Sequence, residues 1–378
     1  MQTTKNLRLR LSKEAPVIMN RKTAHNFIFR GDKLNKKLIE ILETIIKIPS
    51  PTGYDREIVP LILEHIRELG IDVSLTNKGA ILAEIPGESK EAIVFSAHVD
   101  TLGAMVKEVK SNGRLKVTMI GGCPWLSLDA ENCDVRTSDN TRISGTFQGT
   151  KPSVHIDGGE VAKTERNQET TELVLDEKVS SREEAEKLGI SVGDFVFVDP
   201  RFTATENGFI KTRYLDDKAS VAILLEAMAE MKDAKLPNTV YFFISTYEEV
   251  GHGASSGIPD SVREFIAVDM GAPGNGQQSS EFAVNICAMD STGPYDLGIR
   301  ERMTNLCKEK DIPYAIDLYN FYGSDASASQ RSGHDVRTGL IGAGVFASHA
   351  YERTHIDSMD ATLRLVVEYA LAGLPVEK

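Results

Sequence analysis

The chain has 378 residues, of which 41% are hydrophobic and 26% are charged, as is ordinary for a globular protein. Its 43 basic and 55 acidic side chains give a formal net charge of −12. This balance argues against nonspecific binding to nucleic acid or anionic lipid, because such binding needs a basic surface.

No apolar run approaches the roughly 20 residues of a membrane span, and the first segment lacks the apolar core of a signal peptide. We therefore expect a cytoplasmic protein. The four cysteines form no CxxC pair, which argues against zinc fingers and thioredoxin-like sites and predicts plain thiols in a reducing compartment.

The first third of the chain predicts alternating helices and strands. Residues 33–48 and 55–70 carry apolar residues at helical spacing, and three strand-like segments follow, the last at residues 91–100. Such alternation is typical of a layered α/β domain.

The pattern changes after about residue 110. Five short segments with strand character follow, among them PSVHID at residues 152–157, with Gly, Asp and Asn turns between them. One short helix interrupts them at residues 180–190, with Ser180 or Ser181 as its N-cap. Many short strands separated by turns predict a small barrel or sandwich.

Helix and strand alternate again from about residue 213. The predicted elements are helices at residues 215–235, 297–311 and 358–373, and strands at 238–251 and 263–274. We therefore expect one discontinuous α/β domain of residues 30–110 and 206–378. A strand-rich module of residues 111–205 is inserted into it, and residues 1–29 form an extension of unknown role.

Acids and histidines follow the apolar strands of the predicted α/β domain. Ligands collect at the carboxyl ends of strands in open α/β sheets, so these side chains should converge. The residues are His98, Asp100, Asp216, Asp217, Glu248, Glu249 and Asp269, and the segment SHAYERTHIDS adds His349 and His355.

Several carboxylates at the end of a hydrophobic core repel one another and are desolvated. Lys218 and Arg213 are the nearest basic residues in the sequence, and a divalent cation compensates better. A set of His, Asp and Glu without Cys suits Zn²⁺, Co²⁺ or Mn²⁺. Two imidazoles and three carboxylates suffice for two ions about 3.5–4 Å apart.

Each signal is weak when taken alone. A single His is more often a core or surface residue than a ligand, and Asp-Asp or Glu-Glu pairs commonly cap helices or face water. The repetition of the pattern at four strand ends is what favours a metal site.

Five segments in this order resemble one known family. SAHVDTLGAMV, YLDDK, TYEEVG, AVDMG and YERTHIDS look like the dinuclear metallo-aminopeptidases of the tetrahedral type, the glutamyl and deblocking aminopeptidases. The resemblance implies a zinc-peptidase-like three-layer α/β/α catalytic domain with an inserted β-barrel dimerisation domain. It also implies dimers that assemble into a dodecamer.

The resemblance also implies a role for each matching residue. Glu248 matches the general base, Asp100 the acid that orients His98, and the bond between Asp216 and Asp217 a cis peptide. The implied metal ligands are His98 and Asp269 for one ion, Glu249 and His355 for the other, and Asp216 as the bridge.

Two further residues are candidates for lining the cleft. His155 could line the cleft, although a structural or surface role is favoured for it. Asp325 could support the site, and a role in capping a turn fits it equally. The family commonly has Arg where this chain has Lys218, and an Arg-Gly-Ala stretch where this chain has HGAS after Gly251. The second departure bears on specificity.

The expected activity is removal of N-terminal residues from short peptides by a water that bridges two Zn or Co ions, or Mn, with Glu248 accepting its proton. Glu248 and Glu249 would point in opposite directions on a regular strand, so the chain should turn there, and Gly251 permits it. Asp100 should share a face with His98 and accept the other N–H of its ring.

Three alternatives stay open from the sequence. The first is a related binuclear amidohydrolase or deacylase acting on a small amide, although such enzymes usually insert a ferredoxin-like domain. The second is an endoglucanase, a label that some relatives carry, but one Trp in the chain does not favour a sugar cleft. The third is a non-catalytic metal protein, which would not need Glu248.

Overall fold

The computed structural model describes residues 35–375, so the proposed extension at residues 1–29 lies outside the described part. The fold belongs to the compact unit Leu38–Lys378. Within the described residues, no helix combines the length and the apolar character needed to cross a membrane. All four cysteines are free thiols.

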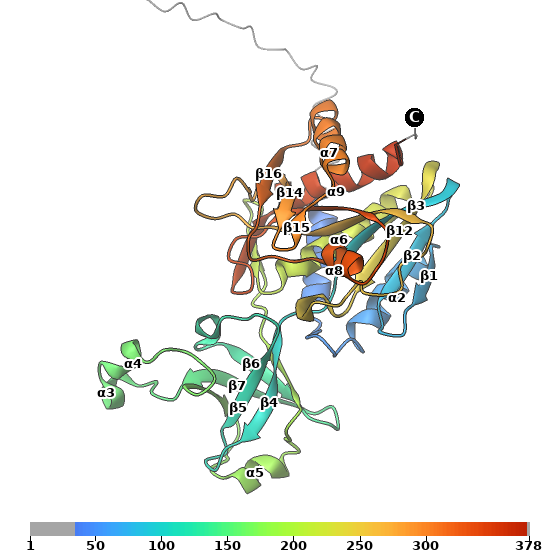
Figure 1. The fold of residues 1–378 in the computed structure, drawn as a ribbon. Coiled ribbons are helices and arrows are strands. Elements are labelled where there is room, and N and C mark those ends of the chain that lie inside the picture. The colour runs from blue at the N-terminus through green and yellow to red at the C-terminus, as the bar shows by residue number, and fades with distance from the viewer. Residues whose placement is uncertain (1–34, 376–378) are drawn as a thin grey trace, which may run out of the picture. The chain divides into compact units, whose positions relative to one another are not determined.

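A nine-stranded mixed sheet forms the centre of the α/β part (Figure 1). Its central strands β12, β3, β13 and β17 run parallel to one another, so their carboxyl ends share one edge. The strand order is β1 (Asp72–Leu75), β2 (Ile81–Ile85), β12 (Leu236–Ser245), β3 (Gly87–His98), β13 (Val262–Gly271), β17 (Arg337–Gly344), β14 (Val284–Asp290) and β15 (Gly293–Pro294), with β16 (Tyr314–Leu318) paired to β14.

Helices cover both faces of this sheet. Neighbouring residues along a strand point to opposite faces, so one strand packs against helices on both sides. On one face Phe95 of β3 packs against Phe242 and against Tyr369 of α9. On the other face the neighbouring Val94 joins a core cluster with Ala326 of α8. The helices are α2 (Ile58–Glu68), α6 (Leu215–Met231), α7 (Leu297–Glu309), α8 (Asp325–Arg331) and α9 (Ile356–Ala372), preceded by a helical segment at residues 35–46. The expected α/β fold class is confirmed.

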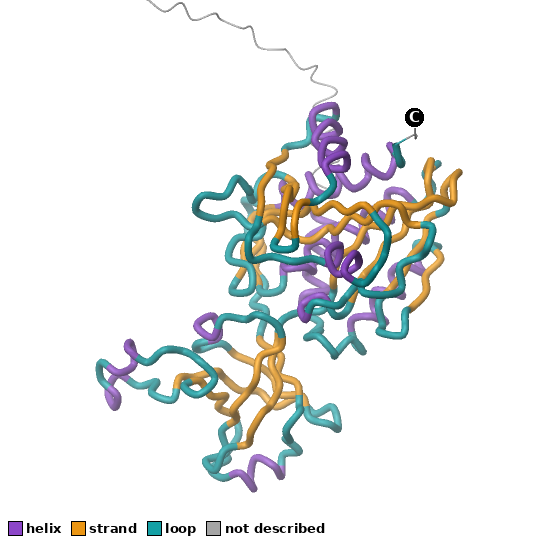
Figure 2. The backbone as a smooth tube through the Cα atoms, in the orientation of Figure 1, coloured by secondary structure: helices purple, strands orange, loops and turns teal. Residues whose placement is uncertain are grey.

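A closed six-stranded barrel is inserted between β3 and α6. It appears as teal and green strands in Figure 1, and its strands are orange in Figure 2. Its order is β4 (Gly103–Val109), β5 (Leu115–Ile120), β8 (Thr171–Leu175), β7 (Arg142–Gly149), β6 (Asn132–Arg136) and β9 (Phe195–Val198). Inward-facing residues such as Val117, Phe147 and Val196 fill it as a separate core. The first barrel strand begins at Gly103, before the expected boundary at residue 111.

Short helices connect the barrel strands. They are η1 (Trp125–Leu128), α3 (Val154–Asp157), α4 (Glu160–Lys163) and α5 (Arg182–Lys187). Ser181 caps α5 by accepting the amide of Glu184 at 3.3 Å, which selects between the two predicted caps. The expectation of a strand in PSVHID is wrong, because residues 154–157 form α3, whose apolar side chains face solvent rather than the barrel core.

A small three-stranded sheet ties the exit of the barrel to the C-terminal motif. It contains β10 (Thr203–Ala204), β11 (Phe209–Thr212) and β18 (Glu352–His355). Antiparallel pairing places Thr212 opposite Glu352 and Phe209 opposite His355. This register determines which residues of SHAYERTHIDS lie near the carboxyl edge of the large sheet.

Candidate metal centre

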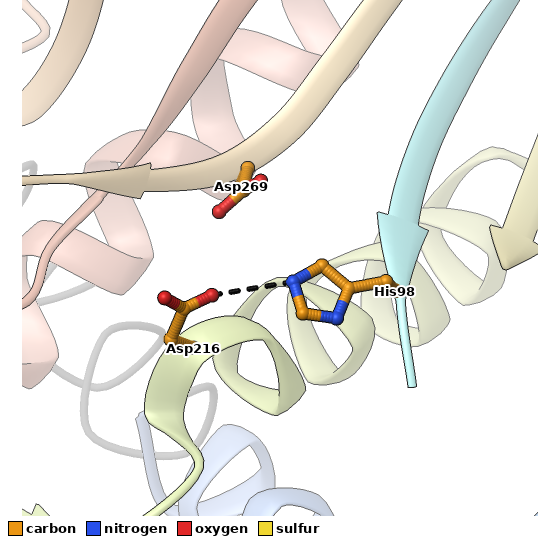
Figure 3. Close-up of side chains that lie close together, drawn as sticks. All are labelled: His98, Asp216 and Asp269. Carbon is orange, nitrogen blue, oxygen red and sulfur yellow. Dashed lines mark hydrogen bonds and ion pairs between the residues drawn. The ribbon is translucent and has the colours of Figure 1, made fainter. Parts of the chain in front are cut away.

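Three ligand-type side chains meet at the carboxyl edge of the large sheet (Figure 3). His98 ends β3, Asp269 lies near the end of β13, and Asp216 is in the first turn of α6. All three are buried, and one candidate ligand atom from each lies within 4.8 Å of the others. We call these three residues the sheet half of the centre.

Asp216 lies between two imidazoles. Its Oδ1 is 3.2 Å from Nε2 of His98, and its Oδ2 is 3.4 Å from Nε2 of His349. The peptide bond between Asp216 and Asp217 is cis, as the resemblance implied. The two carboxylate oxygens therefore face two different histidines.

The Glu-Glu pair follows β12 in a turn, as expected. Glu248–Val250 form a 3₁₀ turn that ends at Gly251 with φ of +83°. The Oε2 atom of Glu248 lies 3.7 Å from Nε2 of His98, and Oε2 of Glu249 lies 3.7 Å from Nε2 of His349. Each glutamate therefore accompanies a different histidine.

His349 and Glu249 both abut the barrel. Nδ1 of His349 lies 3.2 Å from the carbonyl oxygen of Gly122, and a Cβ added to Gly121 would come within 3.5 Å of Oε2 of Glu249. We call Glu249 and His349 the barrel-facing half of the centre.

His355 does not reach the centre, so its predicted ligand role needs correction. Its Nε2 contacts the carbonyl oxygen of Asn207 at 2.8 Å, and its Nδ1 caps α9 by accepting the amide of Asp357. The ring packs on Phe209 and Phe282. The β18 strand carries His355 away from the sheet edge, and His349, which received no role from the sequence, lies at the centre instead.

Asp100 is buried near the centre, but it acts on different atoms than expected. The main-chain carbonyl of Asp100, and not its carboxylate, is the hydrogen-bond partner of Nδ1 of His98, at 2.9 Å, whereas the carboxylate lies 3.6 Å away. The carboxylate instead accepts the main-chain amides of Glu248 at 3.1 Å and Glu249 at 3.3 Å, and the hydroxyl of Thr52. Asp100 therefore holds the Glu-Glu turn in place.

The two weaker candidates lie in different environments. His155 is exposed on α3 of the barrel and does not line the cavity at the centre. Asp325 is buried behind the sheet edge, where it accepts hydrogen bonds from Ser96 and Ser245 and from the amide of Ala254. It supports the strands and the loop that follows Gly251.

The nearest basic side chains do not neutralise the carboxylates. The fully buried Lys218 donates to the carbonyl oxygens of Ile45 and Ile48, and burial lowers its pKa to about 7. Arg213 donates to the carbonyls of Ser127 and Ala350. Across the described residues, no Lys or Arg forms an ion pair with the carboxylates of the centre, which are Asp216, Glu248, Glu249 and Asp269.

Burial and mutual repulsion set the protonation of the cluster. Burial, followed by the charge of Asp216, raises the pKa of Asp269 to about 7, and burial raises the pKa values of Glu248 and Glu249 well above their usual range. Contact with Asp216 raises the pKa of His349 to about 10. Against the effect of burial, the two histidines hold the pKa of Asp216 below its usual range.

These observations fit a metal ion. Oε1 of Glu249 is buried without a hydrogen-bond partner in the described part of the chain, and a buried carboxylate oxygen normally has one. Carboxylates with raised pKa values and histidines facing them are oxygen and nitrogen donors of the kind that Zn²⁺, Co²⁺ and Mn²⁺ accept.

A cavity of about 640 Å³ opens onto the centre. Asp216, Glu248, Glu249, Asp269 and His349 line one end of it. The other walls come from residues 318–324, which follow β16, and from Arg331 and Gln277. A ligand in this cavity can therefore reach residues of both halves of the centre.

Comparisons with known proteins agree with this geometry. The family model for M42 glutamyl aminopeptidase matches residues 79–365. YhfE of Bacillus subtilis, to which an aminopeptidase activity has been attributed, is 45% identical over 88% of this chain and 97% of its own length. The lysyl aminopeptidase of Pyrococcus furiosus is 24% identical over 86% of this chain and 94% of its own. Among solved structures, the TET1 peptidase of Pyrococcus horikoshii, which can assemble into a tetrahedron or a large octahedral shell, superposes with a TM-score of 0.77 at 25% identity, covering 88% and 99% of the two chains.

Proposed function

The chain belongs to the M42 glutamyl aminopeptidase family, and we propose that this aminopeptidase uses two metal ions to remove N-terminal residues from short peptides. The observation that carries the proposal is the position of Asp216. Its two carboxylate oxygens face two histidines from different parts of the chain, which suits a carboxylate that bridges two ions.

The two halves of the centre supply the two proposed ligand sets. His98 and Asp269 would hold one ion and Glu249 and His349 the other, with Asp216 shared between them. This assignment replaces His355 by His349. Zn²⁺ and Co²⁺, or Mn²⁺, suit these donors equally.

The bound ions would acidify a water molecule and polarise the scissile carbonyl. Glu248 lines the cavity beside His98, and no ligand role is needed from it. Its carboxylate would accept the proton of the attacking water and donate it to the leaving amine. Asp100 fixes this glutamate through its main-chain amide, so the base and the ligand Glu249 keep their relative positions.

The substrate requirements follow from the charge of the cavity. A free N-terminal ammonium group is attracted by the acidic side chains of the centre, and the cavity lining also includes aromatic side chains and Arg331. A small amide that lacks a peptide's extent would fill little of the 640 Å³. These features favour short peptides over small amides.

We also propose the division of labour between the domains. The α/β part would form the catalytic domain, and the barrel, from β4 at Gly103 to β9 ending at Val198, would mediate dimerisation, with dimers assembling into a dodecamer. The tetrahedral and octahedral assemblies of the TET1 peptidase support this arrangement. Light scattering of the full chain at micromolar concentration tests it, and a monomeric mass would contradict it.

The variant Glu248→Gln tests the mechanism. It keeps the shape of the side chain but removes its basicity, so kcat on aminoacyl-anilides should fall about 10²- to 10⁴-fold. Elemental analysis should still find about two ions per chain in wild type and variant alike. Unchanged hydrolysis would overturn the role of Glu248, and a wild-type chain that binds no ion would overturn the proposed function.

A further inference from the structure

Glu352 is a buried acid to which the proposed function assigns no role. It opens β18, and only 2% of its surface is exposed. Oε1 accepts the main-chain amide of His349 at 2.9 Å, and Oε2 accepts the main-chain amide of Asp216 at 3.1 Å. We propose that Glu352 is a positioning residue that sets these two ligands relative to each other. The inference rests on the proposed function.

The two ligands come from loops that need such a restraint. His349 has a left-handed φ of +67°, and Tyr214, two residues before Asp216, has a φ of +69°. Residues other than glycine rarely adopt this conformation and keep it only where the surrounding structure holds them. Glu352 accepts one main-chain amide from each loop, so a single buried side chain restrains both.

Glu352 is itself fixed from two sides. Its own strand pairs with β11, where Thr212 lies opposite Glu352. Arg213, the next residue, donates to the carbonyl of Ala350 at 3.3 Å, so the loop that carries His349 is held at its amide and at its carbonyl. The ring of His349 is then oriented by the carbonyl of Gly122.

The Glu-Glu turn of the centre is held by the same device. Asp100 is also buried, and its two oxygens accept the main-chain amides of Glu248 and Glu249. Both oxygens of Glu352 likewise accept main-chain amides. Asp100 therefore holds the Glu-Glu turn, and Glu352 holds Asp216 and His349.

Glu352→Gln is the direct test, because the amide is isosteric but offers one acceptor and one donor. One of the two main-chain amides then faces an NH₂ group. We expect Co²⁺ titration of the full chain to show one ion bound about 10- to 100-fold more weakly, as is typical when a group that orients a ligand is lost. The visible absorption of the Co²⁺ form should change in band position or intensity.

Glu264→Gln is the matched control. Glu264 is equally buried, at 1% exposure, and it binds Arg302, Arg337 and Tyr369 away from the centre. This variant should lower the Tm and leave both Co²⁺ affinities unchanged, which separates positioning from general stability.

The inference is overturned if Glu352→Gln binds both Co²⁺ ions with wild-type affinity and an unchanged spectrum, whatever its Tm. If the Gln variant does not fold, Glu352→Asp repeats the test, because the shorter acid keeps its charge but cannot reach both amides. Weakened binding of one ion supports the proposal, and two wild-type affinities overturn it. A wild-type chain without Co²⁺ affinity would instead overturn the proposed function.

Discussion

The two halves of the candidate centre are built in different ways. In the sheet half, His98 and Asp269 lie on neighbouring parallel strands whose register follows from the main-chain ladder of the sheet. In the barrel-facing half, Glu249 and His349 lie in loops that contact Gly121 and Gly122 of the inserted domain. The sheet half is therefore set by secondary structure, whereas the barrel-facing half depends on how two domains and two loops pack.

This difference predicts that the barrel would affect metal binding at the proposed centre as well as the proposed assembly. The ring orientation of His349 is set by a barrel carbonyl, and Arg213 joins the barrel carbonyl of Ser127 to the His349 loop. Changes in the barrel near residues 121–127 should weaken binding of the ion in the barrel-facing half more than binding of the ion in the sheet half.

Removing one histidine at a time should have the largest effect on metal binding in the two halves of the centre. His98→Ala and His349→Ala should each reduce the metal content to about one ion per chain and remove most of the activity. His98→Ala should also lower the free energy of unfolding by about 1–3 kcal/mol, because it leaves buried acids without a partner, whereas the side chain of His349 is 36% exposed and its loss should affect stability less.

His355→Ala is the matched control for these two variants. It removes the cap of α9, so it should lower the free energy of unfolding by about 1 kcal/mol while about two ions stay bound. Elemental analysis and thermal unfolding measure both quantities. A single ion in His355→Ala would reverse the assignment of His349 and His355.

The pH dependence of metal binding is the next effect. The pKa of Asp269 is raised to about 7 and that of His349 to about 10, so both groups hold a proton in the metal-free protein below these values. An ion must displace these protons, so affinity should fall as pH falls, about tenfold per pH unit for each proton displaced. The sheet half should lose affinity as pH falls, because, against the effect of burial, Asp216 raises the pKa of His98 well above its ordinary value, and Asp269 adds a second proton below pH 7. The barrel-facing half should lose affinity below pH 10.

The same shift acts on the stability of the metal-free protein. The folded pKa of Asp269 lies above its ordinary value of 3.8, so this group destabilises the fold increasingly as pH rises toward 7.

Calorimetric titration with Zn²⁺ in two buffers of different ionisation enthalpy should show net proton release at pH 7. Binding without proton release would contradict the assigned protonation states.

A single methyl group in the barrel gives the smallest expected effect. In Gly122→Ala the new Cβ would lie 3.3 Å from Nδ1 of His349, so the ring must move slightly. The ion in the barrel-facing half should bind up to about tenfold more weakly. Gly159→Ala, whose Cβ would meet open space in the same barrel, should bind both ions like wild type. If the two variants bind both metal ions with the same affinities, the barrel does not affect metal binding at the centre.

Most of the α/β fold could be predicted from the sequence. The apolar residues in segments 91–100, 215–235 and 358–373 recur with the spacing of a strand or a helix. These segments correspond to β3, α6 and α9. The segment that forms α8, DASASQR, has small polar side chains without an apolar period, so it gave no signal. The five strand-like segments after residue 110 indicated a barrel or a sandwich, although one of them, PSVHID, forms α3. The closure of six strands into a barrel is a property of the pairing between strands.

The candidate site divides along the same line. His98, Asp216, Glu248, Glu249 and Asp269 could be identified as candidates because each follows an apolar strand or begins a helix, and parallel strands carry such ends to one edge. The local sequence did not indicate which of His349 and His355 lies at the centre. It was decided by the pairing of β18 with β11 and by the packing of Gly122 against His349, and these contacts join residues more than one hundred positions apart.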